Sequence, residues 1–354
     1  MGIGTDQLAG GGPAPGAEPP GAAPGRPRRN RALRLPRSGK ILTGLGMLAF
    51  FILWAIIGPF VRPYSPDATF ANAPVPLPPS GAHWLGTTQV QQDVFSQLLV
   101  GGGRMIGVAL IGGVIATAAS VVIGVTAGYL GGLADDLLSM LANVFLVMPA
   151  LPLLIIMVGF LGQSTSGNLF VIALVIAVTG WAWGARVLRA QTLSLRNRDY
   201  VDSARIIGER RWRIIASEIL PNLTPIVATS FLFTVLYAVG TYAALAFLGL
   251  VNPNWSWGGM LFYAQLSNAE LTGYWWWFIP PGLAIALLGT SLVLLNFGID
   301  EFINPRLRTA GLTRKSGRRR LRPEFALTPV IRPEVRTGIG TGIATGLATE
   351  GGRR

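Results

Sequence analysis

Few residues in this sequence have the chemistry that catalysis or metal binding requires. The chain has no cysteine and a single histidine, His83, which excludes thiolate chemistry and clusters of imidazole ligands. The only Gly-Lys pair, Gly39-Lys40, is followed by Ile41 and lacks the upstream glycine spacing of a phosphate-binding loop. We therefore expect no catalytic residue, no metal site and no bound cofactor in this chain.

The most informative polar stretch is residues 186–224, which is rich in arginine. Helical spacing is plausible on both sides of Gly208, and the charges of Glu209–Arg213 keep this stretch out of a bilayer. Pro221 is expected to break the chain before the next apolar run. The pattern predicts two short helices folded at a glycine and presented to the cytoplasm. An ordinary basic loop that only fixes topology is the alternative.

Long charge-free runs surround this stretch and must position it. Only 13% of the residues are charged and 51% are hydrophobic, whereas a soluble domain has about 25% charged residues. About 20 apolar residues are needed to cross a bilayer. The sequence therefore predicts an all-α, polytopic membrane protein with six transmembrane helices. The runs are Ile41–Val61, Met105–Tyr129, Leu137–Leu161, Leu169–Ala185, Pro225–Val251 and Pro280–Gly298.

Two alternative interpretations of the apolar runs fit the sequence less well. A secretory signal has an apolar core of only about 7–15 residues, shorter than the first run. Buried helices of a large soluble protein would leave too little polar chain to cover them.

Pro149 and Pro152 are expected to kink the third span. Glycines allow the second span to approach its neighbours closely; these are Gly112, Gly113, Gly124 and Gly128.

The distribution of arginine and lysine predicts the topology. These residues gather in segments 26–40 and 186–224 and after residue 298, and an even number of predicted spans separates each pair of segments. By the positive-inside rule all three segments, and both termini, face the cytoplasm. Leu130–Asp136 would lie on that side too, although its only charges are acidic. The net charge of +13 then reflects topology rather than nucleic-acid binding, and the basic C-terminal tail could touch anionic lipid.

The chain divides into four predicted regions. Residues 1–40 and 309–354 have the composition of disordered, basic cytoplasmic tails. Residues 41–104 comprise the first span and an extracytoplasmic loop, in which Gln91–Val100 could form a short helix on the membrane surface. Residues 105–308 form the membrane-spanning core, which includes segment 186–224.

Two sets of residues inside the core are candidates for contact with a solute. Polar side chains in the spans either line a translocation path or join helices by hydrogen bonds; these are Asn143, Thr241 and Asn296. A tryptophan cluster before the last span is either an interfacial belt or a stacking platform where cargo enters; it comprises Trp275, Trp276 and Trp277.

The arginine-rich segment resembles a known loop. Asp202-Ser203-Ala204, then Gly208, then Leu220-Pro221 are similar to the Glu-Ala-Ala loop of bacterial ABC importer permeases. Other stretches are similar to the dipeptide/oligopeptide branch of that family, from about Ile41 to Arg308. They include Leu85-Gly86-Thr87, Ala185-Arg186, Leu245–Leu250, Ser256-Trp257-Gly258, Pro281–Ile285 and Asn304–Leu307.

This resemblance implies a type I ABC importer permease fold in a bacterial cytoplasmic membrane. It also implies a second homologous permease subunit, two ATPase subunits that bind ATP and Mg²⁺, and an extracytoplasmic substrate-binding protein. In the family the loop forms a coupling helix that docks on the ATPase. Carried over residue by residue, the coupling residues are Asp202, Ser203, Ala204, Gly208, Glu209, Arg210, Leu220 and Pro221.

The cargo stays open at this point. Peptides are favoured by the overall agreement of motifs. Short oligosaccharides are the alternative, because Gln91-Gln92-Asp93 replaces the usual Gly-Arg-Asp and because of the tryptophan cluster. Nickel is a weaker option with one histidine, and a non-transporting membrane scaffold or insertase is a different class altogether.

Overall fold

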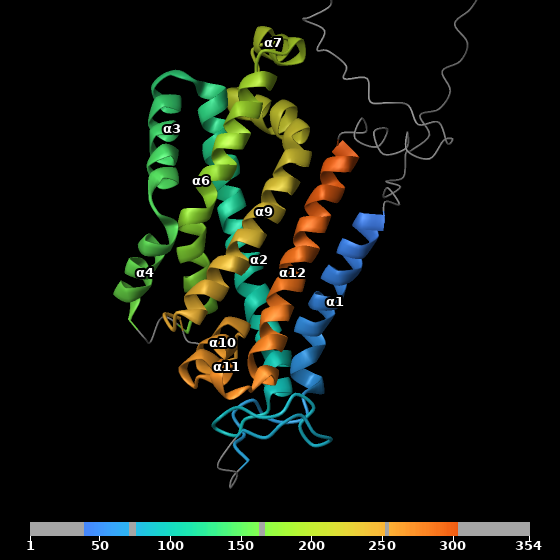
Figure 1. Cartoon of the computed structure of the whole chain (residues 1–354). Coiled ribbons are helices and arrows are strands. Elements are labelled where there is room, and N and C mark those ends of the chain that lie inside the picture. The colour runs from blue at the N-terminus through green and yellow to red at the C-terminus, as the bar shows by residue number, and fades with distance from the viewer. Residues whose placement is uncertain (1–38, 71–75, 163–166, 252–254, 304–354) are drawn as a thin grey trace, which may run out of the picture. The chain divides into compact units, whose positions relative to one another are not determined.

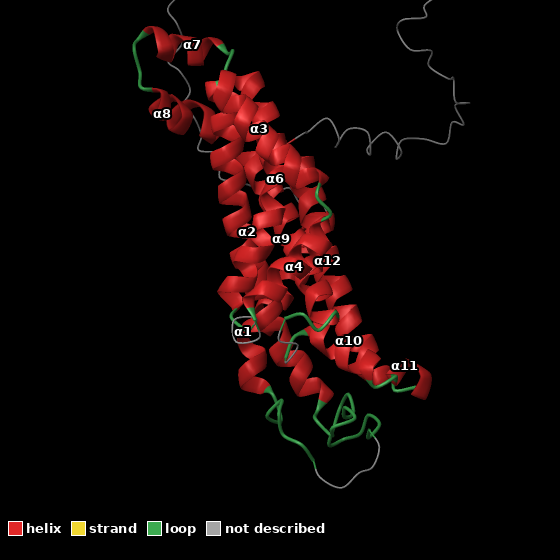
Figure 2. Cartoon of the chain, turned by 90° about the vertical axis from the view of Figure 1, so that its left-hand side faces the viewer, coloured by secondary structure: helices red, strands yellow, loops and turns green. Residues whose placement is uncertain are grey.

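The computed structural model describes residues 39–70, 76–162, 167–251 and 255–303, and every regular element in them is a helix (Figure 1, Figure 2). This confirms the predicted all-α class. Apart from Gly39 and Lys40, the two predicted tails that flank the bundle lie outside the described residues. The helices are α1 (Gly39–Val61), α2 (Val94–Leu130), α3 (Gly132–Val147), α4 (Ala150–Leu161), α6 (Leu169–Leu195), α7 (Asp199–Ile206), α8 (Arg211–Ile214), the π-helical turn Ile215–Ile219, α9 (Leu220–Phe247), α10 (Trp257–Leu266), α11 (Ala269–Thr272) and α12 (Trp275–Ile303).

The described residues contain five helices that are long and apolar enough to cross a membrane, and six if α3 and α4 together make one broken span. The two halves of that span meet at 91°. Met148 is extended, with ψ at 132°, because the residue before a proline is restricted away from helical geometry. Pro149 therefore makes the break. Pro152 lies in the first turn of α4, where proline is tolerated, so the kink predicted there is wrong.

The second span begins earlier than its apolar run. A separate surface helix over Gln91–Val100 is wrong, because α2 begins at Val94 and is continuous to Leu130. Asp93 caps the helix: its Oδ2 accepts a hydrogen bond from the Ser96 N–H at 2.7 Å. An acceptor at this position satisfies a backbone N–H that has no partner within the helix.

The fifth span also begins earlier than predicted. Residues 211–247 form one continuous helical stretch, so the break expected at Pro221 is wrong. The π-helical turn Ile215–Ile219 precedes the proline. Local π adjustments allow a helix to pass a residue that has no N–H to donate.

α2 lies at the centre of the bundle and packs mainly against α6 and α9, while α1 lies beside α12 (Figure 1). Glycine permits the close approach of α2 to α6. A Cβ atom on Gly128 would lie 2.8 Å from the Arg189 carbonyl oxygen, and the Ser120 hydroxyl donates to the Trp181 carbonyl oxygen at 2.6 Å. α6 is the most enclosed span, with 56% of its apolar window buried against 22% for α1.

The bundle has two distinct ends. The beginning of α1 and the segment α7–α8 lie at one end, which we call the basic end (Figure 1). Residues 62–70 and 76–93, α10 and α11 lie at the other, which we call the loop end (Figure 1, Figure 2). Lys40, the described basic residue of the first basic segment, thus lies at the same end of the bundle as the second basic segment.

Candidate functional site

α7 and α8 form a hairpin at the basic end, and its turn is built around Gly208. Gly208 has φ at +86°, a conformation that glycine adopts far more readily than other residues. The Glu209 N–H donates to the Ala204 carbonyl oxygen at 3.1 Å, and the Gly208 N–H donates to the Arg205 carbonyl oxygen at 3.0 Å. This pair of bonds is a Schellman motif, which ends α7. The second arm is the beginning of the long 211–247 helix rather than a separate short helix.

The base of the hairpin is fixed to the bundle by an apolar cluster. Val201 of α7 and Ile214 of α8 are almost fully buried. They pack with Val125, Tyr129 and Leu188, which belong to α2 and α6. Side chains in such a cluster interlock, so this packing joins the hairpin to α2 and α6.

The opposite side of the hairpin exposes apolar side chains. Ile206 is 86% exposed, Ile207 80% and Trp212 64%. We call these three residues the apolar tip. An exposed apolar patch rimmed by charge is typical of a surface that binds another protein.

The charged rim consists of short-range ion pairs. Arg205 pairs with Asp202 at 2.9 Å, and Arg213 pairs with Glu209 at 3.5 Å. Both pairs are solvent-accessible, so each contributes little to stability.

The hairpin brings together six of the eight predicted coupling residues. Asp202, Ser203, Gly208 and Arg210 are exposed, while Ala204 and Glu209 are half-buried. Leu220 and Pro221 instead lie on the long helix beyond the π-helical turn. The sequence did not predict the apolar tip, because only the motif positions were compared with the family and not the apolar residues between them.

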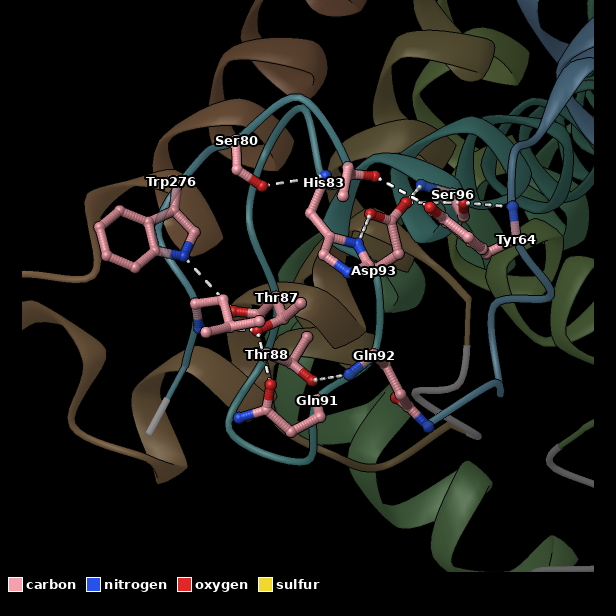
Figure 3. Close-up of polar contacts among 12 residues, drawn as sticks. Tyr64, Ser80, His83, Thr87, Thr88, Gln91, Gln92, Asp93, Ser96 and Trp276 are labelled. Atoms are coloured by element: carbon pink, nitrogen blue, oxygen red, sulfur yellow. Dashed lines mark hydrogen bonds and ion pairs between the residues drawn. The ribbon is translucent and has the colours of Figure 1, made fainter. Parts of the chain in front are cut away.

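At the loop end, a buried polar network fastens the segment before α2 (Figure 3). His83 Nδ1 lies 2.9 Å from Asp93 Oδ1, and the Ser96 hydroxyl donates to Asp93 Oδ2 at 2.7 Å. The Tyr64 N–H donates to the Ser96 hydroxyl oxygen at 3.3 Å. The single histidine of the chain is therefore a partner of the α2 cap.

The predicted tryptophan cluster divides between the interior and the surface. Trp276 and Trp277 are 8% and 2% exposed, whereas Trp275 is 50% exposed. Trp276 Nε1 donates to the Thr87 carbonyl oxygen at 3.4 Å (Figure 3). The three rings therefore do not form one stacking surface.

One of these rings borders a cavity of about 240 Å³ at the loop end. Its lining includes Trp277 together with Asp67, Gln92, Gln97 and Trp255. Gln97 Nε2 donates to Gln92 Oε1 at 2.7 Å, and Trp255 Nε1 donates to Asp67 Oδ1 at 3.1 Å. Gln92, one of the two glutamines that replace the usual Gly-Arg, thus takes part in the lining of this cavity.

The predicted path residues lie on three different helices. Asn143 of α3 is exposed and borders a second cavity of about 240 Å³ with residues of α2 and α6. Thr241 of α9 is buried. Asn296 of α12 has its Oδ1 atom buried without a hydrogen-bond partner in the described residues. The structure does not bring these three side chains to one surface.

An ion pair that sequence reasoning missed joins α3 to α6. Arg189 Nη2 donates to Asp135 Oδ2 at 2.7 Å, its Nε donates to Asp135 Oδ1, and the Ser139 hydroxyl donates to the same Oδ1 at 2.9 Å. Segment Leu130–Asp136, which has only acidic charges although it is predicted to be cytoplasmic, is thus paired with an arginine of α6. The partners lie 54 positions apart, so no local pattern signals them.

Comparison with known proteins agrees with this architecture. The family model described as the binding-protein-dependent transport system inner membrane component matches residues 120–309. The dipeptide transport system permease protein DppC of Bacillus subtilis is 31% identical over 280 residues, covering 78% of this chain and 84% of that protein. OppC of Bacillus subtilis, an oligopeptide transport system permease protein, is 31% identical over 278 residues, 77% of this chain and 88% of that protein.

A third relative has a related description. The probable D,D-dipeptide transport system permease protein DdpC of Escherichia coli K12 is 32% identical over 267 residues, covering 75% of this chain and 87% of that protein. The helical bundle and the matched length together define a multi-pass membrane permease. The chain belongs to the family of binding-protein-dependent transport system inner membrane components.

Proposed function

We propose that this chain is the membrane-spanning subunit of an ATP-driven importer whose cargo is dipeptides or oligopeptides. The observation that carries the proposal is the apolar tip held on a buried base: Ile206 and Ile207 are exposed while Val201 and Ile214 are not. This arrangement would let a partner protein bind one side of the hairpin while the other side stays packed against the transmembrane helices.

The partners follow from this assignment. Two ATPase subunits that bind ATP and Mg²⁺ would contact the hairpin, and a second homologous permease subunit would complete the translocation path. An extracytoplasmic binding protein would deliver cargo to the loop end. The chain would lie in the cytoplasmic membrane of a bacterium, surrounded by lipid, with its basic end and both termini on the cytoplasmic side.

Coupling requires two states that nucleotide populates differently. When the ATPase subunits close on ATP, they would displace the apolar tip. Because Val201 and Ile214 interlock with residues of α2 and α6, the displacement would reach the spans rather than be lost in a flexible loop. The bundle would then alternate between inward-facing and outward-facing arrangements.

Peptide cargo is supported by the three relatives described above, each of which is named as a permease for peptides. The oligosaccharide alternative is not favoured. It rested on the Gln91-Gln92-Asp93 variant and on the tryptophan cluster, and two of the three rings of that cluster are enclosed within the protein.

Uptake in a strain that lacks this chain tests the proposal. Uptake of a labelled short peptide should be lost and should return on complementation, while uptake of a labelled short glucan should not change. Loss of glucan uptake alone would contradict the peptide assignment. Unchanged uptake of both, with no ATPase subunit co-purifying, would favour a membrane scaffold instead.

A further inference from the structure

The open cavity lined by α2, α3 and α6 has polar as well as apolar side chains, although all three helices belong to predicted spans. It has a volume of about 240 Å³, which is large enough to admit water. Its polar lining comes from Ser139 and Asn143 of α3 and from Arg186 and Arg189 of α6. This cavity is separate from the hairpin turn and from the cavity at the loop end.

Arg186 carries a charge that the described part of the chain does not neutralise. Its side chain is exposed and makes no hydrogen bond or ion pair with any described residue. The carboxylate of Asp135 is already held by Nε and Nη2 of Arg189. One guanidinium in the cavity is therefore paired and the other is not.

The position of Arg186 near the basic end of its span keeps it charged. α6 rises about 26 Å between Leu169 and Arg186, against a hydrocarbon core of about 30 Å. An arginine near the end of a span can reach the interface and stay in contact with water. The guanidinium is therefore available to a charged group that enters the cavity from the basic end.

The donors around Arg186 define the chemistry of a ligand. A guanidinium offers two parallel N–H groups that match the two oxygens of a carboxylate. Asn143, about one turn along α3 from Ser139, adds an amide that makes no hydrogen bond with the described residues. The cavity thus presents donors and a net positive charge to its space.

We propose that this cavity binds the terminal carboxylate of the cargo, with Arg186 as the ionic partner and Asn143 as a second donor. The inference rests on the proposed function, because a free peptide ends in a carboxylate. Arg186 thereby favours cargo that carries a free C-terminus.

The absence of cysteine from the chain allows a direct test. Leu138 also lines the cavity, so Leu138→Cys places one thiol there and leaves both proposed ligands intact. The assembled transporter in proteoliposomes is labelled with a water-soluble thiol reagent in the presence of trialanine or its C-terminal amide. We expect trialanine to slow labelling at about one-tenth of the amide concentration that does so.

Further variants connect this difference to the guanidinium. Adding Arg186→Gln should make the acid and the amide equivalent, whereas Arg186→Lys should keep part of the difference because it keeps the charge. Arg62→Gln, which removes an exposed arginine beyond the end of α1, is the matched control and should leave the tenfold difference unchanged.

Peptide uptake by the same proteoliposomes separates the two proposals. Equal protection of the thiol by trialanine and by its amide would overturn the carboxylate site. Peptide uptake in the same proteoliposomes would still support the proposed function. Protection by the acid without any peptide uptake would keep the site and reject peptides as cargo. Labelling that changes with the charge of the lipid headgroups, and not with the peptide, would assign Arg186 to a lipid phosphate and overturn the inference.

Discussion

At the scale of single residues, Ile206 should contribute most to ATPase docking, because it is the most exposed member of the apolar tip. Replacing Ile206 by serine removes apolar area without adding charge. A central interface residue of this kind is worth about 2 kcal/mol, so the ATPase subunits should bind about 30-fold more weakly. Titration of the purified ATPase subunits onto the solubilised permease measures the change.

Leu271 provides the matched control for this substitution. It is as exposed as Ile206, at 86%, but lies in α11 at the loop end. Leu271→Ser should leave the affinity for the ATPase subunits unchanged. Equal affinity of the Ile206→Ser variant and the unchanged protein would show that the tip is not the docking surface.

At the scale of helices, the pair Asp135–Arg189 should stabilise the contact of α3 with α6. Asp135→Asn keeps the side-chain shape but leaves the Arg189 guanidinium without its carboxylate. The loss of two charge-assisted hydrogen bonds in a partly buried site should cost about 2 kcal/mol. Thermal unfolding in detergent should then begin several degrees lower.

The neighbouring acid supplies the control for this prediction. Asp136 is exposed, and it does not line the cavity. Asp136→Asn should leave the unfolding temperature within about one degree of that of the unchanged protein, as is usual for a surface substitution. Equal destabilisation by the two substitutions would mean that the ion pair contributes nothing specific.

The sequence is sufficient to predict most helices at this scale, because a charge-free run of about 20 residues has few other solutions. It is insufficient for their ends. α6 extends past Ala185 to Leu195, and α2 begins at Val94, since helices continue beyond the apolar run where charges are solvated. The break was underestimated as a kink, because Pro149 restricts Met148 but does not by itself fix the 91° angle between the two halves.

The candidate site was predictable where it depends on local backbone chemistry. The turn at Gly208 follows from the residue itself. Contacts between distant segments were not predictable: Trp276 is buried by its contact with Thr87, and Asp135 meets Arg189 only in the folded bundle. A charged residue at the end of an apolar run, such as Arg186, was the one available signal of the cavity between α2, α3 and α6.

At the scale of the whole molecule, the two ends of the bundle should face opposite sides of the membrane. Single thiols test this without background, because the natural chain has none. Gly81→Cys lies at the loop end in open space, and Ser217→Cys lies at the basic end on an exposed surface. An impermeant thiol reagent should label the first in intact spheroplasts and the second only in inverted vesicles.

The opposite labelling pattern would reverse the topology and place the hairpin outside the cell, where ATPase subunits cannot reach it. Labelling of both positions from one side would mean that the chain between them crosses the membrane an even number of times and not the odd number expected. Either result would contradict the assignment of the basic end to the cytoplasm.

The central claim is that the hairpin transmits ATP hydrolysis to the spans, and Gly208→Trp tests it most directly. Any side chain at φ +86° is strained by about 1–2 kcal/mol, and an indole adds bulk at the tip. In proteoliposomes that contain the assembled transporter, peptide uptake and ATP hydrolysis are measured together, with Gly107→Ala in α2 as control. The account predicts that uptake falls much more than hydrolysis in the Gly208→Trp transporter. Normal uptake per ATP at normal protein levels would contradict it.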